Sequence, residues 1–395
     1  MTTETRTRPA KALPRTIWWL SAAWTLASTA DNFVLFVILW IAGPQGWTGT
    51  ETALLVVAIR LPTLLGGVLG GRAVDHFGPV PMLVADGVLR ALLMACLAIA
   101  GWSGQFSLWV VLLLGAAAGT TAPLSFAAAR TLVPRLADEQ ALVRANALLS
   151  VGDQLPMLLG AALAGPTLAL LGPGPAFLLP MLMLSGVAAI ATRLPRSTSS
   201  ADVVSAAPIR LRWKSLRVVG LVALSVAYYF TYGPFETVMP YFVREQLGSD
   251  VGGYTLLWIL FGAAALLTLP LAPMLARRRP GLVNAVGAIV WGMASLPLVL
   301  AHNLVAAAAI FTVAGAIWGP YSAVEATALQ RWTHPAEHGR VFGTQRAFLA
   351  IAAPLGAAAG AVAVDHATPA LVLATSAVGC AVAGALAVPV VRHAD

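Results

Sequence analysis

Twelve apolar segments, each long enough to cross a lipid bilayer, follow one another along the sequence. A membrane-spanning helix needs about 20 mostly apolar residues to cross the hydrocarbon core. Only 10% of the residues are charged, against about 25% in soluble domains, so the chain lacks the polar groups to coat a water-facing surface. The sequence therefore predicts an all-α integral membrane protein. The segments lie at 17–41, 51–72, 80–101, 106–130, 144–171, 174–194, 216–243, 252–276, 281–301, 304–331, 341–364 and 368–391.

The basic residues indicate how these segments are oriented. Of the 24 Lys and Arg residues, 20 fall in one set of alternate connections, Arg244 alone falls in the other, and Arg60, Arg90 and Arg346 lie inside segments. Basic residues gather on the cytoplasmic side of membrane proteins. We therefore expect a bacterial cytoplasmic-membrane protein with both ends in the cytoplasm. The anionic inner leaflet then explains the net charge of +8, and no nucleic-acid partner is expected.

The longest internal polar stretch, 195–215, divides six segments from six and has the composition of a flexible linker. We expect a cytoplasmic arm (1–16), an N-terminal bundle (17–194), the linker (195–215), a C-terminal bundle (216–391) and a tail (392–395). The halves also share a pattern of residues about 196 positions apart, and two parallel six-helix repeats are a transporter architecture. The matching residues are Gly119, Pro123, Arg144 and Gly160 in the first half and Gly315, Pro320, Arg340 and Gly356 in the second.

The connection between the second and third segments resembles the signature of the major facilitator superfamily. In GGRAVDHFGPV, Gly71, Asp75 and Gly78 have the G-x-x-x-D-x-x-G spacing, but a Pro-Val-Pro run stands where basic residues usually follow. The resemblance implies twelve helices in two pseudo-symmetric six-helix bundles that move a small molecule by alternating access. It also implies a cytoplasmic gate, in which we expect Asp75 to contact the first turn of the eleventh segment at Arg340 or Arg346.

A narrower resemblance is carried by FAAARTLVPRLADEQALVRANALLSVGDQLPMLLGAALAG and GRVFGTQRAFLAIAAPLGAAAG. Both stretches are similar to macrolide efflux proteins and enterobactin exporters. This resemblance implies a proton-coupled exporter of a hydrophobic or amphipathic molecule of the drug, macrolide or siderophore class. The antiporter Gly-Pro motif is imperfect, because Ala161 follows Gly160. An importer of a small solute and a non-transporting receptor remain open alternatives.

Ionisable residues inside the segments each cost about 2.5–3.5 kcal/mol to insert and so suggest a function. Asp31 and Arg60 both lie roughly 14–15 Å from the outer end of their segments, counted at 1.5 Å per residue. In the superfamily, segments 1, 4, 7 and 10 line the central cavity, so Asp31 and Glu236 are candidates for proton coupling or for binding a cationic substrate. We expect Arg60 to pair with Asp31, either as a tuning partner that competes with substrate or as a permanent structural ion pair. The alternative for Glu236 is a position at the headgroup level beside Tyr241 and Arg244.

The other charged residues inside the segments have structural or coupling interpretations. Asp86 and Arg90 stand four residues apart and are expected to neutralise each other. Asp153 and Glu325 lie near the cytoplasmic side. Four aromatic residues are candidates for a cavity wall, with core packing as the alternative: Trp318, Tyr228, Tyr229 and Tyr232.

Enzymatic signals are weak. His334 and His338 match an H-x-x-E-H zinc pattern, but no third ligand is evident and we expect no metal; a membrane enzyme built on this loop is the alternative of a different class. No Gly-rich phosphate loop with its Lys occurs, so we expect no direct ATP hydrolysis. We also expect no cofactor and no catalytic residue. The expected partners are a small-molecule substrate, protons and the lipid bilayer, and the expected state is a monomer.

Overall fold

A computed structural model describes residues 13–137, 139–195, 215–277, 279–334 and 337–392, and its elements within these ranges are helices. Most of the expected arm, almost all of the expected linker and the end of the tail lie outside the described residues. Helices of the first half are α1 (Arg15–Ala42), α2 (Gly49–Arg60), α3 (Pro62–Phe77), α4 (Pro79–Trp102), α5 (Leu108–Leu136), α6 (Glu139–Leu171), α7 (Pro173–Ala176) and α8 (Leu178–Ala191).

The second half continues the same pattern. Its helices are α9 (Leu216–Glu245), α10 (Val251–Thr268), η1 (Leu269–Leu271), α11 (Ala272–Leu275), α12 (Pro280–Ser295), η2 (Leu296–Leu300), α13 (Leu304–Trp318), α14 (Tyr321–Trp332), α15 (His338–Val364) and α16 (Pro369–Val391). Several expected segments are broken in two where a proline begins or interrupts a turn, because proline lacks the N–H that continues a helix. The second segment, for example, is divided at Leu61, immediately before Pro62.

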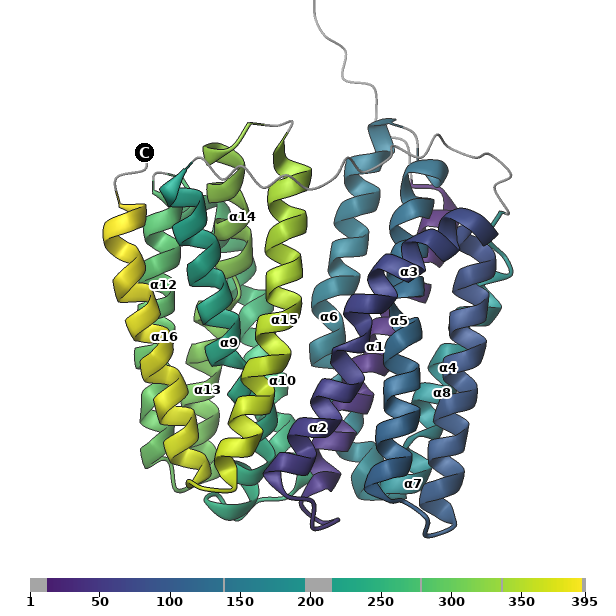
Figure 1. The fold of residues 1–395 in the computed structure, drawn as a ribbon, viewed down its shortest axis with the longest axis horizontal. Coiled ribbons are helices and arrows are strands. Elements are labelled where there is room, and N and C mark those ends of the chain that lie inside the picture. The colour runs from purple at the N-terminus through teal and green to yellow at the C-terminus, as the bar shows by residue number, and fades with distance from the viewer. Residues whose placement is uncertain (1–12, 138, 196–214, 278, 335–336, 393–395) are drawn as a thin grey trace, which may run out of the picture.

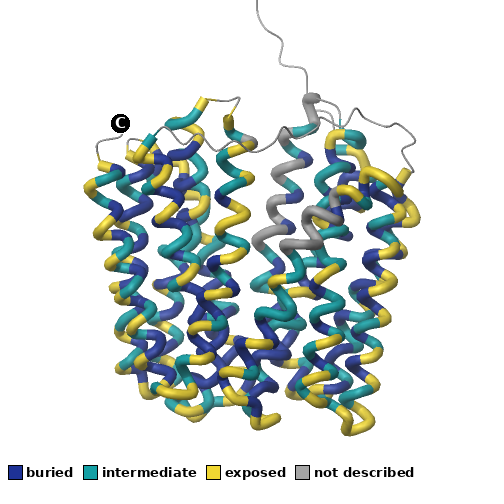
Figure 2. The backbone as a smooth tube through the Cα atoms, viewed as in Figure 1, coloured by how far each residue is buried: buried dark blue, intermediate teal, exposed yellow. Residues whose placement is uncertain are grey.

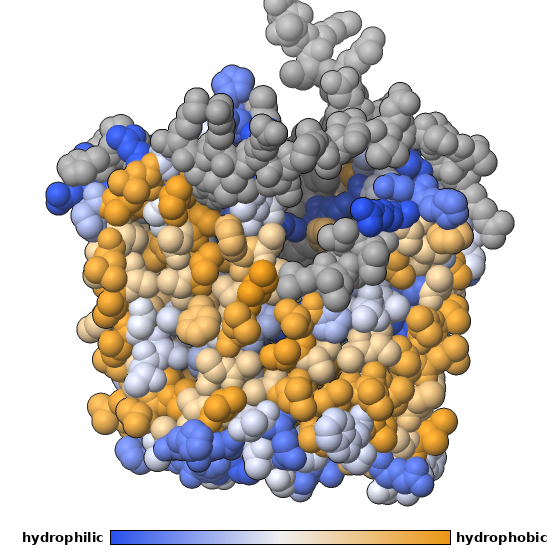
Figure 3. Space-filling view, in the orientation of Figure 1, coloured by the Kyte–Doolittle hydropathy of each residue, from blue (hydrophilic) through white to orange (hydrophobic). Residues whose placement is uncertain are grey.

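Ten helices among the described residues are long and apolar enough to span a membrane. The two expected segments outside this count are the broken α2–α3 pair and α6, whose apolar part is the shorter stretch Leu155–Leu171. Figure 3 shows a broad apolar belt between two polar ends. Large side chains such as Leu170 and Leu267 are more than 80% exposed. Such exposure is stable in lipid, so the fold is that of a multi-pass membrane protein consistent with twelve spans.

The two halves pack in the same way. In the first half, α1 packs on α6 and α8, and α4 packs on α8; in the second, α9 packs on α15 and α16, and α12 packs on α16. Figure 1 shows the two groups of helices side by side, with the start of α9 and the end of α16 at the same end of the molecule. Figure 2 shows buried stretches inside each group and exposed stretches around the outside.

The repeated glycines mark equivalent helix crossings in the two halves. A Cβ on Gly119 would collide with the Ile59 carbonyl of α2, and a Cβ on Gly315 would collide with the Phe261 carbonyl of α10. Gly160 likewise approaches the backbone of α1, and Gly356 approaches that of α9. Glycine permits such close approach because it has no Cβ. The spacing therefore reflects a structural repeat, since each pair joins corresponding helices.

The halves meet mainly through α2 against α15 and α6 against α10. In Figure 1, α2 crosses toward α15 at the end away from the start of α9. With the orientation expected from the basic residues, this contact closes the outer side of the protein.

Candidate functional site

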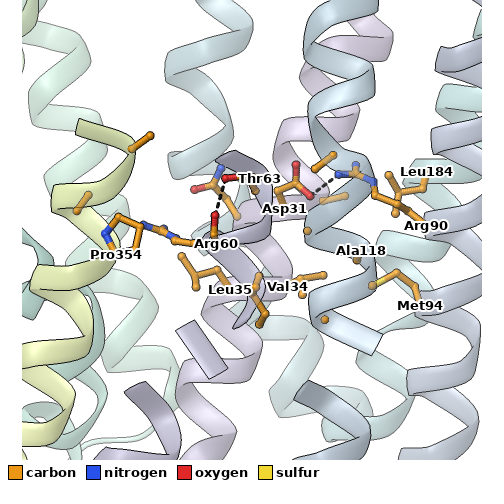
Figure 4. Close-up of a pocket in the computed structure, with 18 of the residues that line it drawn as sticks. Asp31, Val34, Leu35, Arg60, Thr63, Arg90, Met94, Ala118, Leu184 and Pro354 are labelled. Atoms are coloured by element: carbon orange, nitrogen blue, oxygen red, sulfur yellow. Dashed lines mark hydrogen bonds and ion pairs between the residues drawn. The ribbon is translucent and has the colours of Figure 1, made fainter. Parts of the chain in front are cut away.

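A cavity of about 350 Å³ lies between α1, α2, α4, α5 and α15. Figure 4 shows its charged residues, with Asp31 and Arg90 toward α4 and Arg60 toward α15. Most of the other lining residues are apolar, among them Val34, Met94 and others from both halves. Binding pockets for small molecules have volumes of about 300–1,000 Å³ and combine apolar walls with a few polar groups. The cavity therefore has the size and composition of a small-molecule site.

Asp31 is paired with Arg90 and not with Arg60. The Arg90 Nη1 donates to Asp31 Oδ1 at 2.8 Å, and the Arg90 Nε lies 3.4 Å from Asp86 Oδ1, which confirms the expected pair four residues apart. Ser125 donates a further hydrogen bond to Asp86. The Asp31 side chain is 52% exposed, whereas Arg90 and Asp86 are buried. Two carboxyl groups therefore share one guanidinium, and Asp31 is the most exposed member of this cluster.

Arg60 instead joins the two halves. Its Nη1 lies 2.8 Å from Glu236 Oε2, and the side chains are 28% and 18% exposed. The expected Asp31–Arg60 pairing is therefore wrong in this conformation, because α1 packs chiefly on α6 and α8, and α2 turns toward α15. The alternative of a headgroup-level position for Glu236 stays a prediction. This ion pair between α2 and α9 therefore connects the N-terminal half to the C-terminal half.

Three further polar contacts connect the two halves, and we call them together the outer latch. They join Asp365 to the start of α2, Tyr241 to Thr52, and Arg244 to Trp40. Asp365 accepts hydrogen bonds from the backbone N–H of Gly49 (2.6 Å) and of Thr50 (2.8 Å), and from the Thr50 hydroxyl (2.6 Å). The hydroxyls of Thr52 and Tyr241 are 2.9 Å apart. Arg244 donates to the Trp40 carbonyl oxygen at 2.9 Å and lies 4.6 Å from its ring centroid.

Asp365 is the main site residue that the sequence did not reveal. It follows α15 and acts as an N-terminal cap for α2, a helix of the other half, where unpaired N–H groups and the helix dipole favour an anion. Its slight burial raises the pKa of this carboxyl, but the hydrogen bonds from Thr50 and Gly49 outweigh that and hold the pKa below its ordinary value. The sequence signal is the Thr48–Glu51 capping box that begins α2, but nothing in it shows a cap from the other half.

The contact expected for the cytoplasmic gate is not among the ion pairs between described residues. Asp75 and Arg340 are exposed, and none of the ion pairs between described residues includes Asp75. The Arg346 guanidinium lies 5.9 Å from the Phe126 ring of the other half. Gly78 ends α3 at φ 88°, a conformation that favours glycine and explains its place in the signature. The gate stays a prediction for the opposite conformation. Gly71 lies in α3 and Asp153 lies in α6, and the Asp153 side chain is outside the described part of the structure.

The four aromatic candidates pack on one another. The Tyr228 ring is stacked on Trp318 (5.3 Å) and the Tyr232 ring is stacked on Trp318 (4.4 Å), while Tyr229 meets Trp318 edge-on at 5.6 Å. Tyr228 and Tyr232 are buried, and none of the four lines the cavity. In this conformation the cluster supports the alternative of core packing.

Glu325 is also buried. Its carboxyl receives hydrogen bonds from Ser225 on α9 and Gln345 on α15. It is therefore separate from the cavity and from the cluster around Arg90.

Comparison with known proteins agrees with this architecture. Residues 20–330 match the family model of the Major Facilitator Superfamily. The chain is 30% identical over 355 residues to the uncharacterized MFS-type transporter y4rN of Sinorhizobium fredii, covering 86% of this chain and 85% of that protein. It is 25% identical over 352 residues to the multidrug efflux pump Tap of Mycobacterium tuberculosis, covering 84% and 83%.

Solved structures give the same fold at low sequence identity. The nucleoside transporter NupG (D323A mutant) has a TM-score of 0.74 at 11% identity, covering 94% of this chain and 99% of that one. A bacterial homolog of the human lysosomal transporter Spinster, in an inward-facing and unoccupied conformation, has a TM-score of 0.73 at 12% identity, covering 96% and 97%. The helix arrangement, the family match and these relatives lead to one conclusion: the chain is a membrane transporter of the major facilitator superfamily.

Proposed function

We propose that this transporter exports a hydrophobic or amphipathic small molecule across the bacterial cytoplasmic membrane in exchange for protons. The carrying observation is the cavity, whose walls are mostly apolar but which exposes half of the Asp31 side chain. Such a site favours a molecule with an apolar body and a positive charge. The similarity to the efflux pump Tap supports the direction of transport, and the macrolide and enterobactin subgroup stays a prediction.

The outer contacts suggest how export proceeds. With the outer latch closed, the substrate enters the cavity from the cytoplasm and competes with Arg90 for Asp31. Opening to the outside then separates Arg60 from Glu236, so both charges lose a partner that lies 2.8 Å away here. Once the outer side is open, a proton from outside that binds Glu236 removes the charge left without its partner. When the outer side closes again, the pair with Arg60 re-forms and this proton is released toward the cytoplasm. Proton binding and outer opening are thereby linked through one ion pair between the halves.

The test is efflux from cells that lack their own drug pumps. We compare the parent with Asp31→Asn at equal membrane expression, using a cationic dye and a neutral macrolide. Loss of a hydrogen bond to a charged partner costs about 1.5–3 kcal/mol, so efflux of the cation is expected to fall about tenfold or more. The matched control is Asp250→Asn, because Asp250 caps α10 within one half and Asn caps equally well.

The expected pattern is efflux by the parent and the control that stops with a protonophore, and loss of cation efflux in Asp31→Asn. Efflux of the cation retained in Asp31→Asn would contradict the role of Asp31. Parent efflux that survives the protonophore would contradict proton coupling.

A further inference from the structure

Glu325 combines deep burial with neutral partners. It lies on α14 with only 3% of its surface exposed. The Gln345 amide donates to its Oε1, and the Ser225 hydroxyl is in contact with the same atom. Three helices, α9, α14 and α15, therefore meet at one carboxyl group, and both partners are uncharged.

No cation compensates this carboxyl within the described part of the chain. The ion pairs there involve Asp31, Asp86 and Glu236, and Glu325 is in none of them. An unpaired ionised group costs several kcal/mol to bury, so the carboxyl group is more stable in its protonated form. Asp86 provides the contrast, because it is equally buried but has Arg90 beside it.

The other groups around Glu325 do not change this balance. Tyr229 on α9 and Tyr321 on α14 are close enough to interact electrostatically, and Arg346 of α15 is also near Tyr229. The Arg346 guanidinium, however, lies against Phe126 of the other half. The helices α11, α12 and α13, which also pack on α14, contain no ionisable residue.

Hydrogen counting is compatible with a protonated Glu325. The Ser225 hydroxyl is 2.9 Å from the Leu221 carbonyl oxygen and also contacts Glu325. A hydroxyl has one hydrogen and can accept others. If Ser225 donates to Leu221, then a protonated Glu325 can donate to Ser225 while it accepts from Gln345. An ionised Glu325 would instead compete with Leu221 for the single Ser225 hydrogen.

We propose that Glu325 is a second proton-binding site of the transport cycle, in the C-terminal half and apart from the cavity. The proposal rests on the proposed proton-coupled function. The position of Glu325 links it to the outer contacts through two helices. Its partner helix α9 carries Glu236, and its partner helix α15 ends immediately before Asp365. Release of the proton places a charge where these two helices meet and so weakens their packing.

The protonation state can be read by infrared spectroscopy of the purified full chain in lipid nanodiscs. At neutral pH the wild type should show the carbonyl stretch of a protonated carboxyl group, and Glu325→Gln should lack this band. Ser225→Ala should keep the band but shift its frequency, because one hydrogen bond is lost. Glu245→Gln is the matched control, because Glu245 is exposed at the end of α9 and should leave the band unchanged.

Transport in vesicles separates coupling from a structural role. Glu325→Gln should exchange labelled dye for unlabelled dye without a gradient at the wild-type rate, and should lose uptake driven by a pH gradient. Equal loss of both activities, or a protonated-carboxyl band that persists in Glu325→Gln, would overturn the proposal. A wild type that moves none of the dyes would refute the proposed export, while the infrared band still decides whether Glu325 holds a proton.

Discussion

Removal of the Asp365 carboxylate should open the outer side of the transporter more often. This carboxylate belongs to the second half and accepts three hydrogen bonds from the start of α2, which belongs to the first half. Because Asp365 is exposed, the value for a helix cap is the appropriate scale, and replacement of a cap by Ala costs about 1 kcal/mol. Asp365→Ala should therefore raise the ratio of open to closed outer side about fivefold, since 1.4 kcal/mol corresponds to a factor of about ten.

The assay is labelling of a buried cysteine from outside. Val56 is 2% exposed and packs with Leu39 of its own half and with Ala357 of the other half. A cysteine at this position is therefore reachable only when the halves separate. In Val56→Cys protein without the two native cysteines, a membrane-impermeant maleimide should react about fivefold faster after Asp365→Ala. Asp250→Ala is the control, because it removes a cap within one half.

The pH dependence of this contact has a definite sign. The pKa of Asp365 is held below its ordinary value of 3.8, so the stabilisation is fully present above that value and is lost as the pH falls through the lowered pKa. The labelling rate of Asp365→Ala is therefore divided by that of the parent at each pH, because the reactivity of the thiol itself falls with pH in both proteins. This ratio should stay constant from neutral pH down to about 4 and fall toward one below it. Equal labelling of the parent and Asp365→Ala, or an equal increase in Asp250→Ala, would refute the cap between the halves.

Three other changes test the remaining contacts. Reversing either charge of the Arg60–Glu236 pair should reduce gradient-driven transport, and the exchange Arg60→Glu with Glu236→Arg should restore part of it in the same vesicle assay. Arg90→Leu leaves two carboxylates without their cation, which should cost about 3–5 kcal/mol and lower the melting temperature; unchanged melting would show that the cluster is not ionised. Gly356→Ala should also lower the melting temperature because its Cβ meets the α9 backbone, whereas Gly343→Ala, with open space around it on the same helix, should not.

The spans and the repeat could be predicted from the sequence because they depend on local composition. The expected segments agree with the observed helices within about five residues at each end, apart from internal breaks. Breaks such as that before Pro62 depend on how neighbouring helices compensate for a missing N–H, and composition does not show this. The glycines at matching positions predicted the repeat between the two halves. The structure places them at equivalent helix crossings, where a Cβ would collide with the backbone of the neighbouring helix.

The charge pairs were harder to predict because sequence gives depth but not direction. Asp31 and Arg60 lie at similar depths on consecutive helices, yet their side chains point to different neighbours, α4 and α9. Which neighbour each one meets depends on helix rotation and on the conformation of the transporter. Asp365 was missed for a related reason, since its partners are 315 and 316 residues away.

The central claim is that proton movement drives export through the cavity that contains Asp31. The most direct measurement uses inside-out proteoliposomes of the purified protein, loaded with an imposed pH gradient and supplied with a cationic dye from the cytoplasmic side. We expect the dye to accumulate only when the pH gradient is present. Asp31→Asn should abolish this accumulation, and Asp250→Asn should retain it. Accumulation that is independent of the gradient, or that is equal in Asp31→Asn and the parent, would contradict it.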